Sequence, residues 1–167
     1  AEHGPDSQVV LVSTSETVIN ETLAEVERQI ELLPRKAIAA AAIQNSTAVL
    51  VKTIADGVEI INDYAPEHLI IATDNAETVA EQIVNAGSVF IGNYSCESAG
   101  DYASGTNHTL PTGGAARAYS GVTVASFTKT ITFQRLTPDG IRNLGPTIET
   151  MAAAEGLVSV HFVNAAG

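Results

Sequence analysis

The residues of this chain that are best suited to acid–base or metal chemistry are its four histidines: His3, His68, His108 and His161. An imidazole can transfer protons near neutral pH, and it is a common ligand of transition metals. A single histidine is more often a surface or hydrogen-bonded core residue than a ligand. The carboxylates near each histidine therefore decide which of them could form a site.

His68 directly follows Glu67 in a short connection that begins after the helix-breaking Pro66 and ends at the apolar Leu69. An adjacent carboxylate and imidazole titrate in different pH ranges, as stepwise proton transfer requires. A solvated polar loop is an equally valid interpretation of the same residues. The local sequence leaves both open.

A second candidate lies in a loop, where Asp101 and His108 are seven residues apart among glycine, serine and threonine. Small residues let a ligand approach the backbone closely, so this loop could hold a metal or a substrate. The spacing matches no standard metal signature, and a turn-rich surface loop is the alternative. Gly113 and Gly114 do not fit a phosphate-binding loop, so the residues themselves reveal no cofactor fingerprint.

Short apolar runs alternate with amphipathic ones in the part of the chain that must position these residues. We predict strands at residues 8–13, 47–52, 69–73 and 88–92, and helices at 15–33, 53–62 and 75–86. This alternation indicates an α/β layered domain with a mostly parallel sheet flanked by helices, Rossmann-like but incomplete.

The pattern changes after Gly92. Residues 93–121 are rich in glycine and serine and predict a long loop with a short helix at 96–102. Residues 128–135 alternate with a period of two, which predicts a further strand, and Pro138 begins a helix that runs to about Glu155. We therefore divide the chain into an α/β catalytic and metal-binding portion, 1–136, and a C-terminal helix and tail, 137–167.

Composition excludes several classes of function. The chain has 167 residues and a formal net charge of -11, with eight basic residues against 19 acidic ones. This balance argues against nucleic-acid binding, which usually needs a basic patch. No apolar run approaches the roughly 18 residues of a membrane span, and the lone Cys96 cannot form an intrachain disulfide. We expect a cytoplasmic location.

Four segments taken together resemble the histidinol dehydrogenase family in order and spacing. They are residues 1–8 (AEHGPDSQ), 64–69 (YAPEHL), 85–90 (NAGSVF) and 100–108 (GDYASGTNH). The resemblance spans nearly the whole chain but covers less than half of that enzyme, namely its C-terminal part. Members of the family are zinc-dependent homodimers that oxidise L-histidinol through the aldehyde to L-histidine, in histidine biosynthesis, and reduce two NAD molecules.

The resemblance implies a role for each candidate residue. Glu67 and His68 match the acid–base pair, with His68 accepting the proton of the alcohol and later of the hydrate, and Glu67 activating water. Zinc ligands are implied at His3, Asp101 and His161. Substrate contacts are implied at His3, His68, Asp101, His108, Glu155 and His161. The family's NAD-contacting segments lie upstream of all of these residues.

Two departures from the family pattern concern the metal site. The family's first zinc ligand is a glutamine directly before Ala-Glu-His, and the sequence begins with that Ala, at Ala1. The final zinc-binding histidine normally follows a Glu-Gly-Leu-like stretch after two further residues. Here three residues separate Leu157 from His161, one more than in the family.

Two functions from different classes remain. The chain is either part of a functional histidinol dehydrogenase whose N-terminal portion lies elsewhere, or a truncated, non-catalytic α/β module that at most binds zinc or an imidazole ligand. An unrelated α/β nucleotide-binding or signalling domain is disfavoured, because all four histidines fall in family-like segments.

Overall fold

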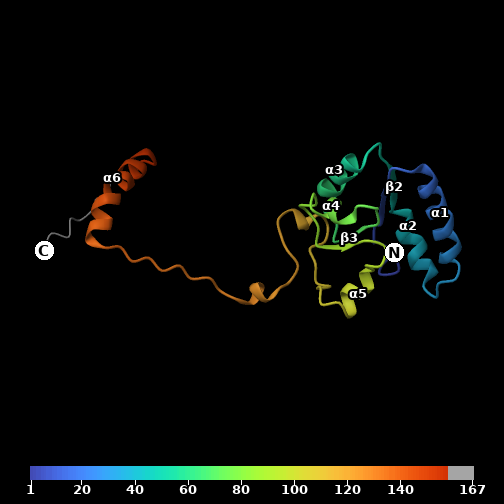
Figure 1. Cartoon of the computed structure of the whole chain (residues 1–167). Helices are drawn as coiled ribbons and strands as arrows, with labels where there is room; N and C mark the ends of the chain where they lie inside the picture. Colours follow the sequence, from blue (N-terminus) through green and yellow to red (C-terminus); the bar gives the residue numbers. More distant parts are fainter. Residues whose placement is uncertain (158–167) are drawn as a thin grey trace. The chain divides into compact units, whose positions relative to one another are not determined.

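The computed structural model describes residues 1–157 and divides the chain into two compact units, Ala1–Phe127 and Thr128–Gly167 (Figure 1). The first unit contains all the strands of the described residues and most of the helices. The second contains one long helix. The boundary that we expect after residue 136 stays a prediction.

The first parallel strand pair of unit 1 joins β1 (Val10–Ser13) to β2 (Thr47–Leu50), with Val10 opposite Thr47. Helices α1 (Glu16–Ile30) and α2 (Lys36–Gln44) form the connection between them. Parallel strands need a long crossover of this kind. Helix α1 begins where we expect it, because the Ser15 side chain accepts a hydrogen bond from the Val18 amide. The sequence analysis did not predict α2.

The second parallel pair joins β3 (His68–Ile71) to β4 (Ser88–Ile91), in register from His68 and Ser88 onward. Its neighbours in the chain are α3 (Ile54–Tyr64) and α4 (Ala76–Ala80). A cluster of buried apolar residues lies here and consists of Val58, Leu69, Ile71, Ala76 and Val79. Helix α4 is much shorter than the helix predicted for residues 75–86.

The expected class is confirmed: unit 1 is α/β, with parallel strands flanked by helices. The strands form two separate two-stranded sheets, however, whereas we expected one sheet. Helix α3 contacts both sheets. Its Gly57 lies against Val12 of β1, whereas Val58 belongs to the core cluster with Leu69 and Ile71 of β3. The Tyr64 hydroxyl also donates to Gln8 Oε1 at 2.7 Å. Residues after β4 form the predicted short helix, α5 (Glu97–Tyr102), and two 3-10 turns, Ala115–Arg117 and Val124–Phe127.

In unit 2 the strand predicted at residues 128–135 is wrong, because the described chain has no strand there. Its alternating side chains need the edge of another strand to pair with, and no described strand pairs with this segment. Ile131 and Phe133 are 69% and 91% exposed. The predicted C-terminal helix is confirmed as α6 (Pro138–Ala154), capped by the Thr137 side chain.

Among the residues described, no helix has both the length and the apolar character to cross a bilayer.

Candidate active site

The candidate site is built around His68, the first residue of β3. Helix α3 ends at Ala65, which has a left-handed backbone with φ of 53°, and Pro66 then prevents further helix. The ladder with β4 begins at once, since the Ser88 amide donates to the Glu67 carbonyl at 2.9 Å. The backbone of Glu67 and His68 is therefore fixed by the second sheet.

Helix α5 supplies two carboxylates to the site, from Glu97 and Asp101. These residues are four positions apart, so they lie on the same face of the helix. Gly100 allows α5 to approach β4 closely, because a Cβ at this position would lie 2.6 Å from Phe90 Cε1. The Phe90 ring in turn stacks with the His68 ring, with centroids 6.0 Å apart. Phe90 therefore lies against both His68 and helix α5.

The three functional side chains converge on a small volume. His68 Nε2 lies 3.7 Å from Asp101 Oδ1 and 3.9 Å from Glu97 Oε1. All three groups offer ligand atoms within 4.8 Å of one another. One nitrogen and two oxygen donors suit a cation such as zinc. The fold therefore brings one imidazole and two carboxylates to one place.

Two polar atoms of this cluster lack hydrogen-bond partners among the described residues. His68 Nε2 and Asp101 Oδ1 are buried and have no hydrogen-bond partner among the described residues. A buried polar atom without a partner costs roughly 1–3 kcal/mol, so native structures usually satisfy it with a water, ion or ligand. The cluster therefore fits a bound cation or a polar substrate group.

The electrostatics of the cluster are dominated by its two carboxylates. Partial burial raises the pKa of Glu97 above its ordinary value, and the hydrogen bond and negative charge of Asp101 act in the same direction. Electrostatic interactions with His68 and with the Ala1 amino group act in the opposite direction and are weaker.

The other predicted site residues lie outside this cluster. His3 and His108 are exposed, and Glu67 is half-buried. The backbone of His3 is held by Arg35, whose guanidinium donates to the His3 carbonyl at 3.5 Å. His161 lies outside the described residues.

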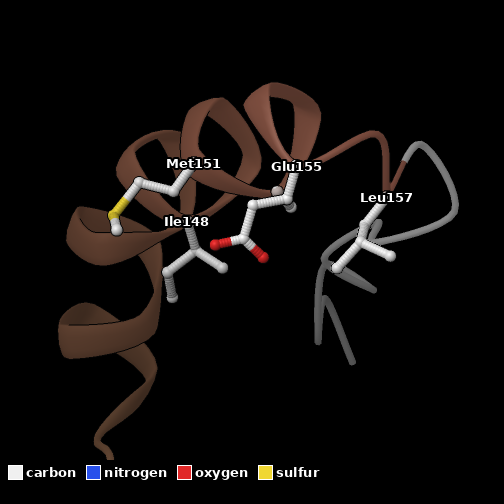
Figure 2. Close-up of a pocket in the computed structure, with 5 residues that line it drawn as sticks. Ile148, Met151, Glu155 and Leu157 are labelled. Atoms are coloured by element: carbon white, nitrogen blue, oxygen red, sulfur yellow. The ribbon is translucent and has the colours of Figure 1, made fainter.

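Glu155 belongs to unit 2, at the C-terminal end of α6. With Ile148, Met151, Ala152 and Leu157 it lines an apolar hollow beside the helix. Figure 2 shows the Glu155 carboxylate between the side chains of Ile148 and Leu157. An acidic group beside an apolar surface can orient a ligand that has a cationic or N–H group next to an apolar part.

Sequence reasoning missed Glu97, although the signal was present. The short helix was predicted, and a carboxylate four residues before Asp101 must share its face. The position of α5 next to His68 could not be predicted from residue spacing, because it depends on the packing of Gly100 against Phe90.

Comparisons with known proteins point to one family. A model of the family described as histidinol dehydrogenase matches residues 1–163. The histidinol dehydrogenase of Bacteroides thetaiotaomicron is 55% identical over 161 residues, 96% of this chain and 37% of its own length. That of Haemophilus influenzae is 52% identical over 95% of this chain and 37% of its own.

A solved structure agrees with these sequences. The crystal structure of histidinol dehydrogenase from Elizabethkingia anophelis matches with a TM-score of 0.87 and 56% identity, over 95% of this chain and 37% of that one. The chain thus spans about 37% of the length of the relatives that it matches.

Proposed function

The chain belongs to the histidinol dehydrogenase family, and we propose that it forms the C-terminal part of an enzyme that oxidises L-histidinol to L-histidine with reduction of NAD. The observation that carries this proposal is the cluster of His68, Glu97 and Asp101, with its two unpartnered buried atoms. It offers a proton-transfer group beside potential metal ligands, and the reaction needs both.

His68 is the acid–base residue in this proposal. Its imidazole accepts the hydroxyl proton of the alcohol in the first oxidation and that of the aldehyde hydrate in the second. Glu67 accepts a proton from the water that adds to the aldehyde between the two oxidations. The ladder between β3 and β4 supports both roles, because it fixes the backbone from which these side chains extend.

Asp101 is a zinc ligand in this proposal, together with His3 and His161. Zinc, when bound, would orient the imidazole and amino groups of histidinol for hydride transfer. The unpartnered Oδ1 of Asp101 is the atom in this chain that best fits such a cation. Substrate contacts are proposed at the ligands and at His68, His108 and Glu155.

The rest of the enzyme completes the site. The sequence has no glycine-rich loop of the dinucleotide-binding type, so this chain does not fit the NAD-binding role, and we assign NAD binding to a portion N-terminal to these residues. We also propose a cytoplasmic homodimer. The acidic chain leaves no role for nucleic acid or membrane surfaces.

The direct test is an assay of purified chain with L-histidinol, NAD and zinc, in which the absorbance of reduced nicotinamide is followed. We expect no turnover by the chain alone, and turnover once the N-terminal portion of a close relative is supplied. Absence of turnover in both cases would overturn the proposal.

A second test uses the assembled enzyme with His68→Ala. Loss of a general base typically costs about 10²–10⁴-fold in rate, so we expect kcat to fall by that factor while the unfolding temperature stays near that of the parent. An effect below tenfold would remove His68 from the acid–base role.

The same assay addresses a second function, a non-catalytic module that binds zinc. The observation that favours this alternative is that His68, Glu97 and Asp101, which could hold a metal ion, all belong to this chain. Zinc binding without turnover in every assembly would support it.

A further inference from the structure

We propose that Glu97 is a positioning residue for His68, which holds the imidazole toward α5 while Asp101 is engaged by the metal. The inference rests on the proposed function, since it concerns the acid–base residue of that reaction. Glu97 lies outside the four family-like segments.

His68 lies next to both carboxylates of α5. His68 Nε2 faces two carboxylates at similar distances, 3.7 Å to Asp101 Oδ1 and 3.9 Å to Glu97 Oε1. No described residue forms a hydrogen bond with this nitrogen. Among the described residues, the carboxylates that lie within 4 Å of this nitrogen are the two side chains of α5, on one face of one helix.

The two carboxylates of α5 would have different roles when a metal ion is bound. A carboxylate that ligates a dication directs its oxygens to the metal, so Asp101 is less available to the imidazole. Glu97 is then the remaining carboxylate within reach of His68. Its side chain is 42% exposed against 21% for Asp101, so it can shift the short distance to the ring without disturbing the core.

The His68 ring has an aromatic neighbour, Phe90. Phe90 stacks with His68 and restricts the plane of the imidazole, but an aromatic face gives the ring no hydrogen bond that would fix its rotation within that plane. An acid–base histidine usually has a carboxylate or carbonyl that sets its orientation. Among the described residues, Glu97 is the carboxylate near His68 Nε2, at 3.9 Å, that is not one of the expected zinc ligands, and a small movement would bring it within hydrogen-bond distance.

The experiment compares Glu97→Gln with the parent in the assembled, zinc-loaded enzyme. Glutamine keeps the size of the side chain and removes its charge. We expect kcat to fall about 10–100-fold, the range typical for loss of a residue that orients a catalytic or ligating group. The KM for histidinol and for NAD should stay within about twofold. The rate of zinc release to a coloured chelator should equal that of the parent.

Glu77→Gln is the matched control, because Glu77 is an exposed glutamate in the first turn of another short helix of the same unit, α4. It should leave kcat, KM and zinc release unchanged. Thermal unfolding of all three proteins checks the fold.

Two results would overturn the inference. If Glu97→Gln keeps the parent's kcat, Glu97 does not position His68. If it releases zinc faster than the parent, Glu97 is a metal ligand instead. A parent enzyme that fails to oxidise histidinol would refute the proposed function itself, and that failure is visible before any variant is compared.

Discussion

His68 Nε2 lies 3.7 Å from Asp101 Oδ1, although one residue begins strand β3 and the other lies on helix α5. In the sequence they belong to two separate candidates, an acid–base pair and a metal loop. Their proximity joins these into one site. A change at Asp101 should therefore affect both metal retention and proton transfer.

Asp101→Asn should weaken zinc retention. The amide keeps the shape of the side chain but removes the negative charge that attracts a dication, and neutral amides are poorer zinc ligands than carboxylates. We expect the variant enzyme to lose zinc faster than the parent during dialysis against a chelator, as measured by metal analysis of the retained protein.

Asp74→Asn is a suitable control, because Asp74 is an exposed aspartate of the same unit outside the cluster. It should keep the parent's zinc content. Equal zinc retention by the Asp101 variant would mean that Asp101 is structural.

Gly100→Ala should destabilise unit 1. The added Cβ would lie 2.6 Å from Phe90 Cε1 and 2.7 Å from Thr106 Oγ1, closer than side-chain contacts allow. Overpacking of this kind typically costs about 1–3 kcal/mol, more than the roughly 1 kcal/mol that alanine gains over glycine in a helix. Urea unfolding of the variant and the parent measures the difference.

Gly57→Ala provides the comparison within another helix, α3. There the new Cβ would lie 3.3 Å from Val12 Cγ1, so the neighbour needs to move only a few tenths of an ångström. We expect a smaller loss of stability than for Gly100→Ala. The reverse order would show that the contact with Phe90 does not limit the approach of α5.

Much of the fold of unit 1 was predictable from periodicity, because its elements are bounded by strong local signals. Ser15 begins α1, and the predicted strands coincide with the observed ones to within about two residues at most ends. The strand predicted at 128–135 is not observed. Alternation of side chains is a local property, whereas a strand also needs a neighbouring strand with which to form hydrogen bonds, and the segment alone does not determine this.

The site was only partly predictable. The motif residues His68 and Asp101 were identified from their neighbours and the family resemblance, and the structure brings them together. Glu97 was missed because it belongs to no motif, and its relation to His68 arises from tertiary packing through Gly100 and Phe90. The positions expected for His3, His108 and Glu155 as ligands or substrate contacts stay predictions.

Cys96, at the start of α5, should be an unusually reactive thiol. It is exposed, and hydrogen bonds from the Ala99 amide and the Ser98 hydroxyl lower the pKa of the thiol below its ordinary value of 9.0. The thiolate is the reactive form, so the rate of alkylation by iodoacetamide should reach half its maximum below that pH. Mass spectrometry of the modified protein over a pH series measures this midpoint.

Ser98→Ala should raise the midpoint, because it removes the hydroxyl that donates to Cys96 Sγ. Ser95→Ala is the control, since the Ser95 hydroxyl donates to the Ile91 carbonyl instead. If both serine variants behave as the parent does, the Ser98 hydroxyl does not stabilise the thiolate.

The ion pair of Glu25 and Arg28 on α1 should make part of the stability pH-dependent. The Arg28 guanidinium donates two hydrogen bonds to the carboxylate, at 2.6 and 2.8 Å, and with Gln29 it lowers the pKa of Glu25 from 4.5 to about 2. A lowered pKa means that the folded state favours the ionised carboxylate, so the pair stabilises α1 above pH 4.5 and loses this effect as the pH falls toward 2. Arg28→Ala should therefore raise the pKa of Glu25 in a carboxyl NMR titration and lower the unfolding temperature slightly at pH 7 and by less at pH 2. Lys52→Ala, which removes an exposed cation elsewhere, should leave the titration of Glu25 unchanged. An unshifted Glu25 titration in the Arg28 variant would show that the pair does not persist in solution.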